Sequence, residues 1–307
     1  MPYFSIVIPV YNKAAFLKAT LDSVLAQSFT DFELILVNDG STDDSTKVIA
    51  GFKDDRIGYF EKENGGASTA RNFGIAQATS RYITFLDADD YWYPDFLQEM
   101  FRLTNRFAYE KIFAAAIEIE MPEKVFPAQY SIAFGNDAQI VDYFDASTRT
   151  TAICTSCAVF EKSLFEEIGN FDTNIKSGQD TDLWIRMGLR YPVVFSPKIL
   201  ARYVYDAQSL SKNKAHIKKL DFSKFASEEK TNRKLKKFLD LNRYSFAVRC
   251  KLNGNFASFS EYRRAIDLRN LSLKKRILVD LPAFVLKELI ELNLLLVRLG
   301  ISRSAFK

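Results

Sequence analysis

Three aspartates stand within four positions at the end of an apolar run, in the stretch ITFLDADD. In an extended segment residues i and i+2 project to the same side, so we expect Asp87 and Asp89 to converge while Asp90 points elsewhere. Such neighbours repel one another unless a positive charge lies among them. Two carboxylates suit Mg²⁺ or Mn²⁺, which also take water and substrate phosphate oxygens as ligands. Alternatively, these acids solvate a loop and Asp90 caps a helix near Pro94.

The elements that must position these aspartates alternate between strand and helix. Short apolar runs typical of strands buried on both faces of a sheet occur at 5–10, 32–37, 57–60 and 81–86. Helical patterns follow the first three, the first of them with Phe16, Leu17, Leu21, Val24 and Leu25 on one face. This alternation predicts right-handed βαβ units and a doubly wound α/β sheet.

Polar residues follow each predicted strand, where such sheets bind their ligands. They are Tyr11 and Asn12, then Asp39, then Asn64 to Arg71, and last Asp87 to Asp90. We therefore expect four loops to meet at one edge of the sheet. The segment after the first strand has no G-x-G-x-x-G pattern, so the dinucleotide-binding fingerprint is absent from the sequence.

Four motifs in this order, SIVIPVYN, VNDGSTDDS, NGGASTARN and FLDADDYW, resemble the family 2 glycosyltransferases with the GT-A fold. The resemblance covers roughly residues 3–211. It implies a Rossmann-like, doubly wound mixed sheet and a glycosyltransferase of the hexosyltransferase type. Such enzymes move a sugar from a nucleoside-diphosphate sugar, here expected to be a UDP-sugar, to an acceptor hydroxyl with inversion. The resemblance also implies a divalent metal, Mg²⁺ or Mn²⁺.

Donor contacts implied by the resemblance involve Pro9, Tyr11, Asp39, Asn64, Arg71 and Asp87, with Asp89 on the metal that bridges the phosphates. An aromatic face and a carboxylate that accepts a base N–H suit uracil. The residues alone leave other interpretations open. Tyr11 could pack in the core, Asp39 could form an Asx-type turn, and Arg71 could be a cation on a helix surface.

A later acidic stretch, SGQDTDLWIRMGLRY at 177–191, resembles the family's acidic pair at a helix start. Asp180 matches the family's general base, Gln179 stands where Glu is common, and Asp182 is the next acid on the acceptor side. A helix start favours an ionised Asp180, which could alternatively be only an N-terminal capping acid. In the segment YVYDAQSLS at 203–211, Asp206 takes the place of the family's metal-binding His, and a solvated loop acid is the alternative.

The charge balance divides the chain near residue 211. Residues 1–211 contain 19 Lys and Arg against 29 Asp and Glu, and residues 212–307 contain 23 against 9. We expect a GT-A catalytic domain at 1–211 and a basic, mainly helical region at 212–307. The apolar stretch 277–300 contains charged residues, among them Asp280 and Lys287, so it is a poor membrane span. It suits a helix in the membrane interface, or one packed on the catalytic domain or on a second subunit of a homodimer.

The remaining features of the sequence indicate where in the cell the protein acts and what it binds. The start of the sequence has no signal-peptide pattern and there are three cysteines, so we expect a cytoplasmic protein, peripheral on the inner face of the membrane. We expect a glycan or lipid-linked acceptor and no nucleic acid, because no binding module accompanies the basic charge. One rival is a non-catalytic protein that binds sugar nucleotides. The other, a sugar nucleotidyltransferase, needs a glycine-rich basic loop, which PVYNKAAF is not.

Overall fold

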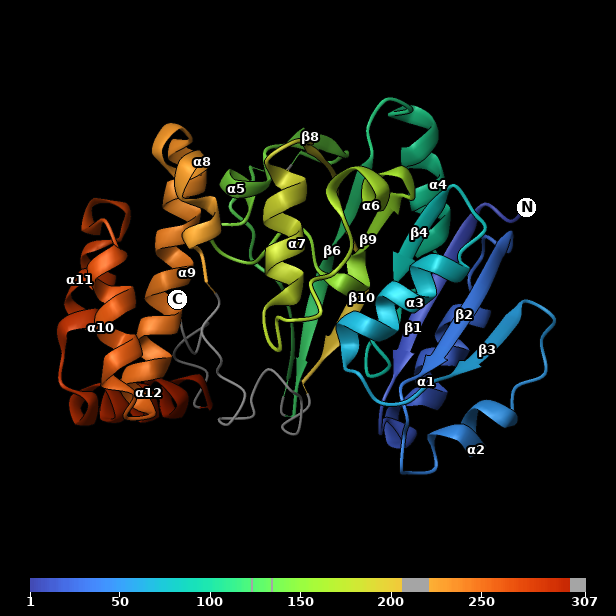
Figure 1. Ribbon diagram of the computed structural model, residues 1–307, viewed down its shortest axis with the longest axis horizontal. Helices are drawn as coiled ribbons and strands as arrows, with labels where there is room; N and C mark the ends of the chain where they lie inside the picture. Colours follow the sequence, from blue (N-terminus) through green and yellow to red (C-terminus); the bar gives the residue numbers. More distant parts are fainter. Residues whose placement is uncertain (123, 134, 206–220, 299–307) are drawn as a thin grey trace. The chain divides into compact units, whose positions relative to one another are not determined.

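The computed structural model describes residues 1–122, 124–133, 135–205 and 221–298. The chain forms two compact units, Met1–Leu210 and Ser211–Lys307 (Figure 1). The boundary coincides with the position at which the charge balance of the sequence changes sign. Each unit is described by itself.

A mixed ten-stranded sheet forms the first unit, with the path β3-β2-β1-β4-β9-β6-β10-β5 and with β7 and β8 paired to β6 and β10. The first four strands are parallel, whereas β9 runs antiparallel between β4 and β6. The strands are β1 (Phe4–Val10), β2 (Phe32–Asn38), β3 (Ile57–Glu61), β4 (Tyr82–Phe85), β5 (Tyr91–Trp92), β6 (Ile112–Met121), β7 (Lys124–Pro127), β8 (Gln139–Val141), β9 (Ala158–Glu161) and β10 (Val193–Val204). The predicted α/β class and its first four strands are confirmed.

Helices connect these strands and cover the sheet (Figure 1). They are α1 (Ala14–Leu25), α2 (Ser45–Ala50), α3 (Ala67–Gln77), α4 (Phe96–Arg106), α5 (Tyr143–Ala146), α6 (Ser163–Ile168) and α7 (Gln179–Gly188), with a 3₁₀ turn η1 (Thr155–Cys157). On α1 the residues Leu17, Leu21 and Val24 recur at helical spacing and are buried in the cluster that also contains β1 side chains. On α3, a Cβ at Gly74 would lie 2.2 Å from Val7 Cγ1, so glycine permits this helix to pack closely on β1.

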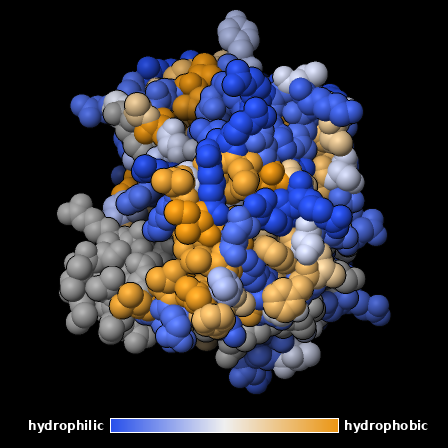
Figure 2. Space-filling model, turned by 90° about the vertical axis from the view of Figure 1, so that its left-hand side faces the viewer, coloured by the Kyte–Doolittle hydropathy of each residue, from blue (hydrophilic) through white to orange (hydrophobic). Residues whose placement is uncertain are grey.

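The second unit is helical in the part that the structure describes. Its elements are η4 (Ser223–Phe225), α8 (Ala226–Thr231), α9 (Arg233–Leu252), α10 (Phe256–Ala265), η5 (Leu268–Asn270), α11 (Leu273–Asp280) and α12 (Ala283–Arg298). Side chains of Asn232, Asn255 and Ser272 accept backbone N–H groups at the starts of α9, α10 and α11. Among the described residues, no helix is both long and apolar enough to cross a bilayer. The face shown in Figure 2 nevertheless carries apolar side chains at its surface.

Candidate active site

The loops after β1 and β2 are joined by one asparagine. Asn12 has a positive φ of 51°, which asparagine tolerates better than most residues. Its Oδ1 accepts the N–H of Thr42 at 2.7 Å, and its own N–H donates to Ser41 Oγ at 3.1 Å. This arrangement fixes the neighbouring Tyr11, whose side chain is 45% exposed. The core-packing interpretation of Tyr11 is therefore wrong.

Asp39, directly after β2, is buried and ties this loop to the loop after β3. Its Oδ1 accepts Lys62 Nζ at 2.5 Å and Gly65 N at 3.1 Å, and its Oδ2 accepts Gly66 N at 2.7 Å. The Asx-type turn in this segment is made by Asn38, whose Oδ1 accepts the N–H of Ser41, so that interpretation of Asp39 is wrong.

Two further residues that were predicted to contact the sugar nucleotide, Asn64 and Pro9, lie near these loops. A Cβ on Gly40 would approach Asn64 N to 2.9 Å, which shows how closely the two loops pack. Asn64 is exposed there, and Pro9 in β1 is half-buried.

Arg71 of α3 is 5% exposed, so it is not a cation on the helix surface. Its Nη2 donates to Asp87 Oδ1 at 2.5 Å, and its guanidinium lies 5.4 Å from the ring centroid of Phe171. Among the described residues, none accepts a hydrogen bond from its Nε or Nη1. Buried N–H groups without acceptors are rare in folded proteins. These two N–H groups are available to the acceptor oxygens of a ligand or of ordered water.

The aspartates after β4 lie in a turn, because the strand ends at Phe85 and Asp90 N donates to Asp87 O at 2.9 Å. The expectation of an extended segment here is wrong. Asp89 Oδ2 accepts Lys13 Nζ at 2.7 Å, so a lysine and Arg71 are the cations that face Asp89 and Asp87.

Asp90 is buried and acts as the anchor of this turn. Its Oδ2 accepts Ser156 Oγ at 2.6 Å, and its Oδ1 accepts Val204 N at 2.9 Å. Ser156 Oγ in turn accepts the N–H of Asp87 at 3.2 Å. Asp90 therefore does not cap a helix near Pro94, and it joins the aspartate turn to η1 and to the end of β10.

The two cations do not cancel the mutual repulsion of these carboxylates. Burial, and after it the charge of Asp87, raises the pKa of Asp89 above its ordinary value. Burial and then the charges of Asp87 and Asp89 raise the pKa of Asp90 well above its ordinary value. A further cation beside these carboxylates would reduce their mutual repulsion.

The carboxylate oxygens of Asp87 and Asp89 fit Mg²⁺ or Mn²⁺ in one respect. Each ion pair uses one oxygen of Asp87 or Asp89, and Mg²⁺ characteristically takes one or two carboxylates and completes its shell with water and phosphate. Within the described part of the chain, no three His, Cys, Asp or Glu side chains are arranged to hold a metal by themselves. Asp206, the other predicted ligand, lies outside the described residues.

The predicted base, Asp180, lies in the first turn of α7. Gly178 before the helix has a φ of 86°, and Asp180 Oδ1 accepts the N–H of Thr181 at 2.7 Å. Asp180 and Gln179 are both half-buried. This position places the Asp180 carboxylate at the positive end of the helix dipole.

Asp182 is 0% exposed, and its Oδ2 accepts Arg186 Nε at 3.0 Å. Arg186 also donates to the carbonyls of Ile168 and Gly169, so this pair fixes the segment between α6 and α7. This ion pair gives Asp182 a structural role, and its acceptor-side role stays a prediction.

Four site residues were not predicted from the sequence: Lys13, Lys62, Ser156 and Phe171. Lys13 follows the first motif directly, and its charge two residues after Tyr11 was a usable signal. Phe171 contacts Arg71 on one side and lies 6.0 Å, ring to ring, from Trp184 of α7 on the other. It thereby connects the α3 side of the site with the helix that carries Asp180.

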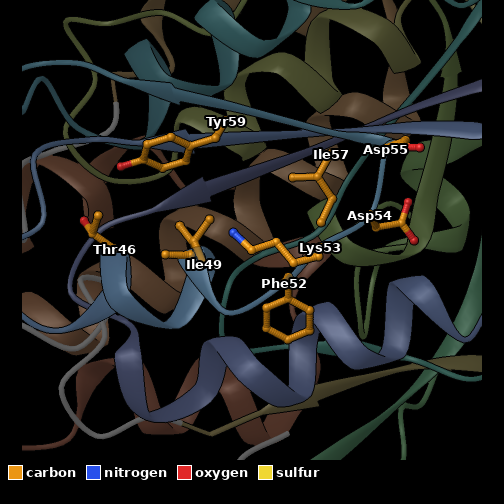
Figure 3. Close-up of a pocket in the computed structure, with 9 residues that line it drawn as sticks. Thr46, Ile49, Phe52, Lys53, Asp54, Asp55, Ile57 and Tyr59 are labelled. Atoms are coloured by element: carbon orange, nitrogen blue, oxygen red, sulfur yellow. The ribbon is translucent and has the colours of Figure 1, made fainter.

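A separate pocket of about 440 Å³ lies between α2 and β3. Figure 3 shows Ile49 and Lys53 opposite Ile57 and Tyr59 in it. Asn38 Nδ2 donates to Tyr59 Oη at 3.1 Å, which places one end of the pocket beside the carboxyl end of β2. The pocket shares no lining residue with the aspartate turn.

Comparison with known proteins supplies the family context. A family model described as "Glycosyl transferase family 2" matches residues 5–169. An uncharacterized glycosyltransferase of Rickettsia typhi is 32% identical over 68% of this chain and 66% of its own length. Another from Rickettsia bellii is 30% identical over 93% of this chain and 41% of its own length. The chain thus spans between about two fifths and two thirds of these two relatives.

Solved structures share the GT-A fold. Staphylococcus aureus TarS (residues 1–349) in complex with UDP-GlcNAc superimposes with a TM-score of 0.67 at 17% identity, over 87% of this chain and 82% of that one. The mannosyltransferase PcManGT of Pyrobaculum calidifontis, in complex with GDP-Man and Mn²⁺, gives a TM-score of 0.55 at 18% identity, over 91% and 78%. At this identity the likeness shows the fold.

Proposed function

The chain belongs to glycosyl transferase family 2, and from this premise we propose that it transfers a sugar from a nucleoside-diphosphate sugar, in the first place a UDP-sugar, to a hydroxyl of a glycan or lipid-linked acceptor with inversion. One observation carries the proposal. Arg71 is buried beside the aspartate turn with two N–H groups that no described residue accepts. A diphosphate supplies the anionic oxygens that such donors bind.

The donor would lie across the loops after β1 to β4. The exposed ring of Tyr11, with Pro9 beside it, offers an apolar surface for stacking of the base. Within the described part of the chain, Asp39 Oδ2 accepts only the N–H of Gly66. Its second lone pair can therefore accept an N–H of uracil. The exposed Asn64 borders the same place. Arg71 would hold phosphate oxygens.

Asp87 and Asp89 would hold Mg²⁺ or Mn²⁺ at the diphosphate, with Asp206 as a further ligand by resemblance. When bound, the metal would neutralise the negative charge that develops on the leaving diphosphate. Lys13 keeps Asp89 in place through the ion pair at 2.7 Å. Asp90 and Ser156 hold the turn in which both ligands lie.

Asp180 would act as the general base. Its carboxylate takes the proton of the acceptor hydroxyl while that oxygen forms the new bond to the anomeric carbon. The bond from this carbon to the diphosphate oxygen breaks on the opposite face, which inverts the anomeric centre. Proton transfer to Asp180 accompanies attack by the acceptor oxygen, so the hydroxyl need not be ionised beforehand. Gln179 would contact the acceptor as a neutral hydrogen-bonding group.

The test begins with UDP-, GDP- and dTDP-sugars in the presence of Mn²⁺, with thermal shift as the binding measurement and release of the nucleoside diphosphate as the measure of turnover. We expect Asp180→Asn to bind the donor with unchanged affinity and to lose turnover by about a thousandfold. The matched control is Glu166→Gln, another acid in the first turn of a helix, which should change neither quantity.

Three outcomes would contradict the proposal. Full turnover by Asp180→Asn would remove this residue as the base. Formation of pyrophosphate from a nucleoside triphosphate and a sugar phosphate would indicate a nucleotidyltransferase. Donor binding without release of the diphosphate, across a panel of glycan and lipid-linked acceptors, would indicate a sugar-nucleotide-binding protein.

A further inference from the structure

The last two described helices of the second unit carry apolar side chains on their outward sides. Leu273 and Ile277 are four residues apart on α11, and Phe284 and Leu292 are eight apart on α12, so each pair lies on one side of its helix. Their exposed fractions are 71%, 55%, 71% and 52%. These four residues are called the α11–α12 surface. Figure 2 shows apolar side chains gathered on the face that it presents.

This surface is not needed for the core of the unit. Val279 on α11 is fully buried and Leu286 on α12 is 2% exposed, and both helices pack on α9. Each helix thus has one apolar side facing inward and a second facing solvent. Single exposed apolar residues are ordinary, but several on adjoining helices are typical of a binding surface.

The charge of the unit indicates what the surface binds. Residues 212–307 contain 23 Lys and Arg against 9 Asp and Glu. Several of these acids are already paired within the unit, as in Glu229 with Arg243 and Asp280 with Arg263. The net field of the unit is therefore positive. Lys274 on α11 and Lys287 on α12 are exposed beside the apolar residues.

We propose that the α11–α12 surface docks the protein on a membrane that contains anionic lipids. The helices would lie in the interface, with the apolar side chains among the acyl chains and the lysines at the headgroups. Glu288 and Glu291 are exposed on α12, so the attraction to anionic headgroups comes mainly from α11 and from the rest of the unit.

The alternative occupant, a second copy of the chain, fits the charge less well. A two-fold interface places the same surface opposite itself, which would bring two positive units together. Anionic lipid supplies the opposite charge. A bilayer surface also needs no shape complement to side chains that project from two separate helices.

The test uses the full-length protein in co-sedimentation with phosphatidylcholine vesicles, with and without about 30 mol% phosphatidylglycerol. We expect binding only with phosphatidylglycerol, and weaker binding at high salt because charge attraction is screened. The triple variant Leu273→Ser, Ile277→Ser, Phe284→Ser should lower the partition coefficient by about tenfold or more. Equal partitioning of the variant and the wild type would overturn the proposal.

The matched control is Tyr109→Ser, Val125→Ser, Ile140→Ser, which removes three exposed apolar residues from the first unit. It should bind vesicles as the wild type does, and an equal loss in the control would overturn the assignment to α11 and α12. Sedimentation velocity of both variants tests the second-copy alternative. A dimer that the α11–α12 variant alone converts to monomer, with unchanged vesicle binding, would also overturn the proposal.

A second variant guards against loss of folding. Phe284→Trp keeps a large aromatic residue at an exposed position, and the native Trp92 and Trp184 are both 2% exposed. Because the native indoles are already buried, a blue shift of emission on adding phosphatidylglycerol vesicles would report insertion of residue 284. An unchanged spectrum with vesicles that bind the protein would overturn the proposal for α12.

Discussion

The aspartate turn of the first unit and a charged cluster on α8 and α9 of the second unit both hold buried or half-buried carboxylates beside cations. In the helical cluster, Arg243 donates to both oxygens of Glu229, at 2.5 and 2.7 Å, and also to Asp240 at 3.1 Å. Lys236 donates to the same two acids at 2.7 and 3.0 Å. Two acids thus face two cations. Burial alone would raise the pKa of Glu229, but the hydrogen bonds from Arg243 and Lys236 outweigh it and hold this pKa below its ordinary value.

The aspartate turn shows the opposite balance. Lys13 and Arg71 pair with Asp89 and Asp87, whereas Asp90 has only neutral partners in Ser156 and the N–H of Val204. The pKa of Asp89 and of Asp90 is raised, and Arg71 keeps two N–H groups without a described acceptor. A saturated cluster holds helices together, whereas an unsaturated one is completed by a ligand. This difference predicts that substitutions in the turn affect activity and those in the helical cluster affect stability.

The largest expected effect is on turnover. Asp89→Asn removes a proposed metal ligand while it preserves shape, and we expect the transfer rate to fall by about a thousandfold, or about 4 kcal/mol in the barrier. The free energy of unfolding should change by less than about 1 kcal/mol, because one repulsive charge is removed with one ion pair. Steady-state kinetics with Mn²⁺ and urea unfolding measure the two quantities. The control is Asp44→Asn, whose partner Lys47 is exposed. A large loss of stability with normal kinetics would remove the distinction between the clusters.

The next effect is on stability. Arg243→Met leaves the half-buried Glu229 and the buried Asp240 with Lys236 alone, and we expect the free energy of unfolding to fall by about 3 kcal/mol. Affinity for UDP, measured by calorimetry, should not change. The control Arg269→Met removes an arginine whose side chain is 89% exposed beside Asp267, and should leave the free energy of unfolding unchanged. A weakened UDP affinity in a folded Arg243→Met protein would contradict a purely structural role.

A smaller effect is expected for the arginine of the first unit. Arg71→Met should weaken UDP binding by about 2 kcal/mol, roughly thirtyfold, because the phosphate oxygens lose charged donors. The stability should change little, since Met fills a similar volume and removes two buried N–H groups that lack acceptors. Calorimetry measures the affinity for UDP. Arg81→Met is the control, because the Arg81 side chain is 62% exposed. Unchanged affinity in a folded Arg71→Met protein would exclude Arg71 from the donor site.

Most of the parallel half of the sheet could be predicted from the sequence because β1, β2 and β4 are buried on both faces, whereas the edge strand β3 is half-buried or exposed. Such strands appear as unbroken apolar runs, as in β1, where Ile6, Val7 and Ile8 are all fully buried although they alternate between faces. Their carboxyl ends follow from the βαβ connection. The loop residues Tyr11, Asp39 and Asp87, and Arg71 on the helix after β3, were located in this way.

The rest depends on pairing between distant segments, which local pattern does not encode. Ser156 reaches Asp90 across 66 positions because β9 enters antiparallel beside β4, and Val204 reaches it across 114. The region 105–176, which contains η1 and Phe171, showed no transferable pattern. The rule that residues i and i+2 project to the same side also failed after Phe85. It assumes an extended chain, and the chain turns there. Asp182 looked available in sequence, but its burial is set by packing of α7.

The smallest expected effect is a change in acid sensitivity. The pKa of Glu229 in the folded chain lies below its ordinary value of 4.5, so the unfolded chain takes up this proton first as the pH falls. The stabilising contribution is therefore present above pH 4.5 and is lost below it, as the pH falls through the lowered pKa. Asp90 affects stability in the opposite direction. Its pKa in the folded chain is raised above 3.8, so the stability that it contributes falls as the pH rises from 3.8 through the raised pKa.

Glu229→Gln should be less stable than the wild type at neutral pH, by about 1 kcal/mol. It should lose less stability between pH 4.5 and 3, because the group that titrates in the wild type is gone. Thermal unfolding across this range measures the difference in slope. Glu288→Gln, an exposed residue of the same unit, should follow the wild-type curve. Parallel curves for Glu229→Gln and the wild type would show that the helical cluster does not hold Glu229 ionised, and the contrast with the aspartate turn would then rest on features of that turn alone.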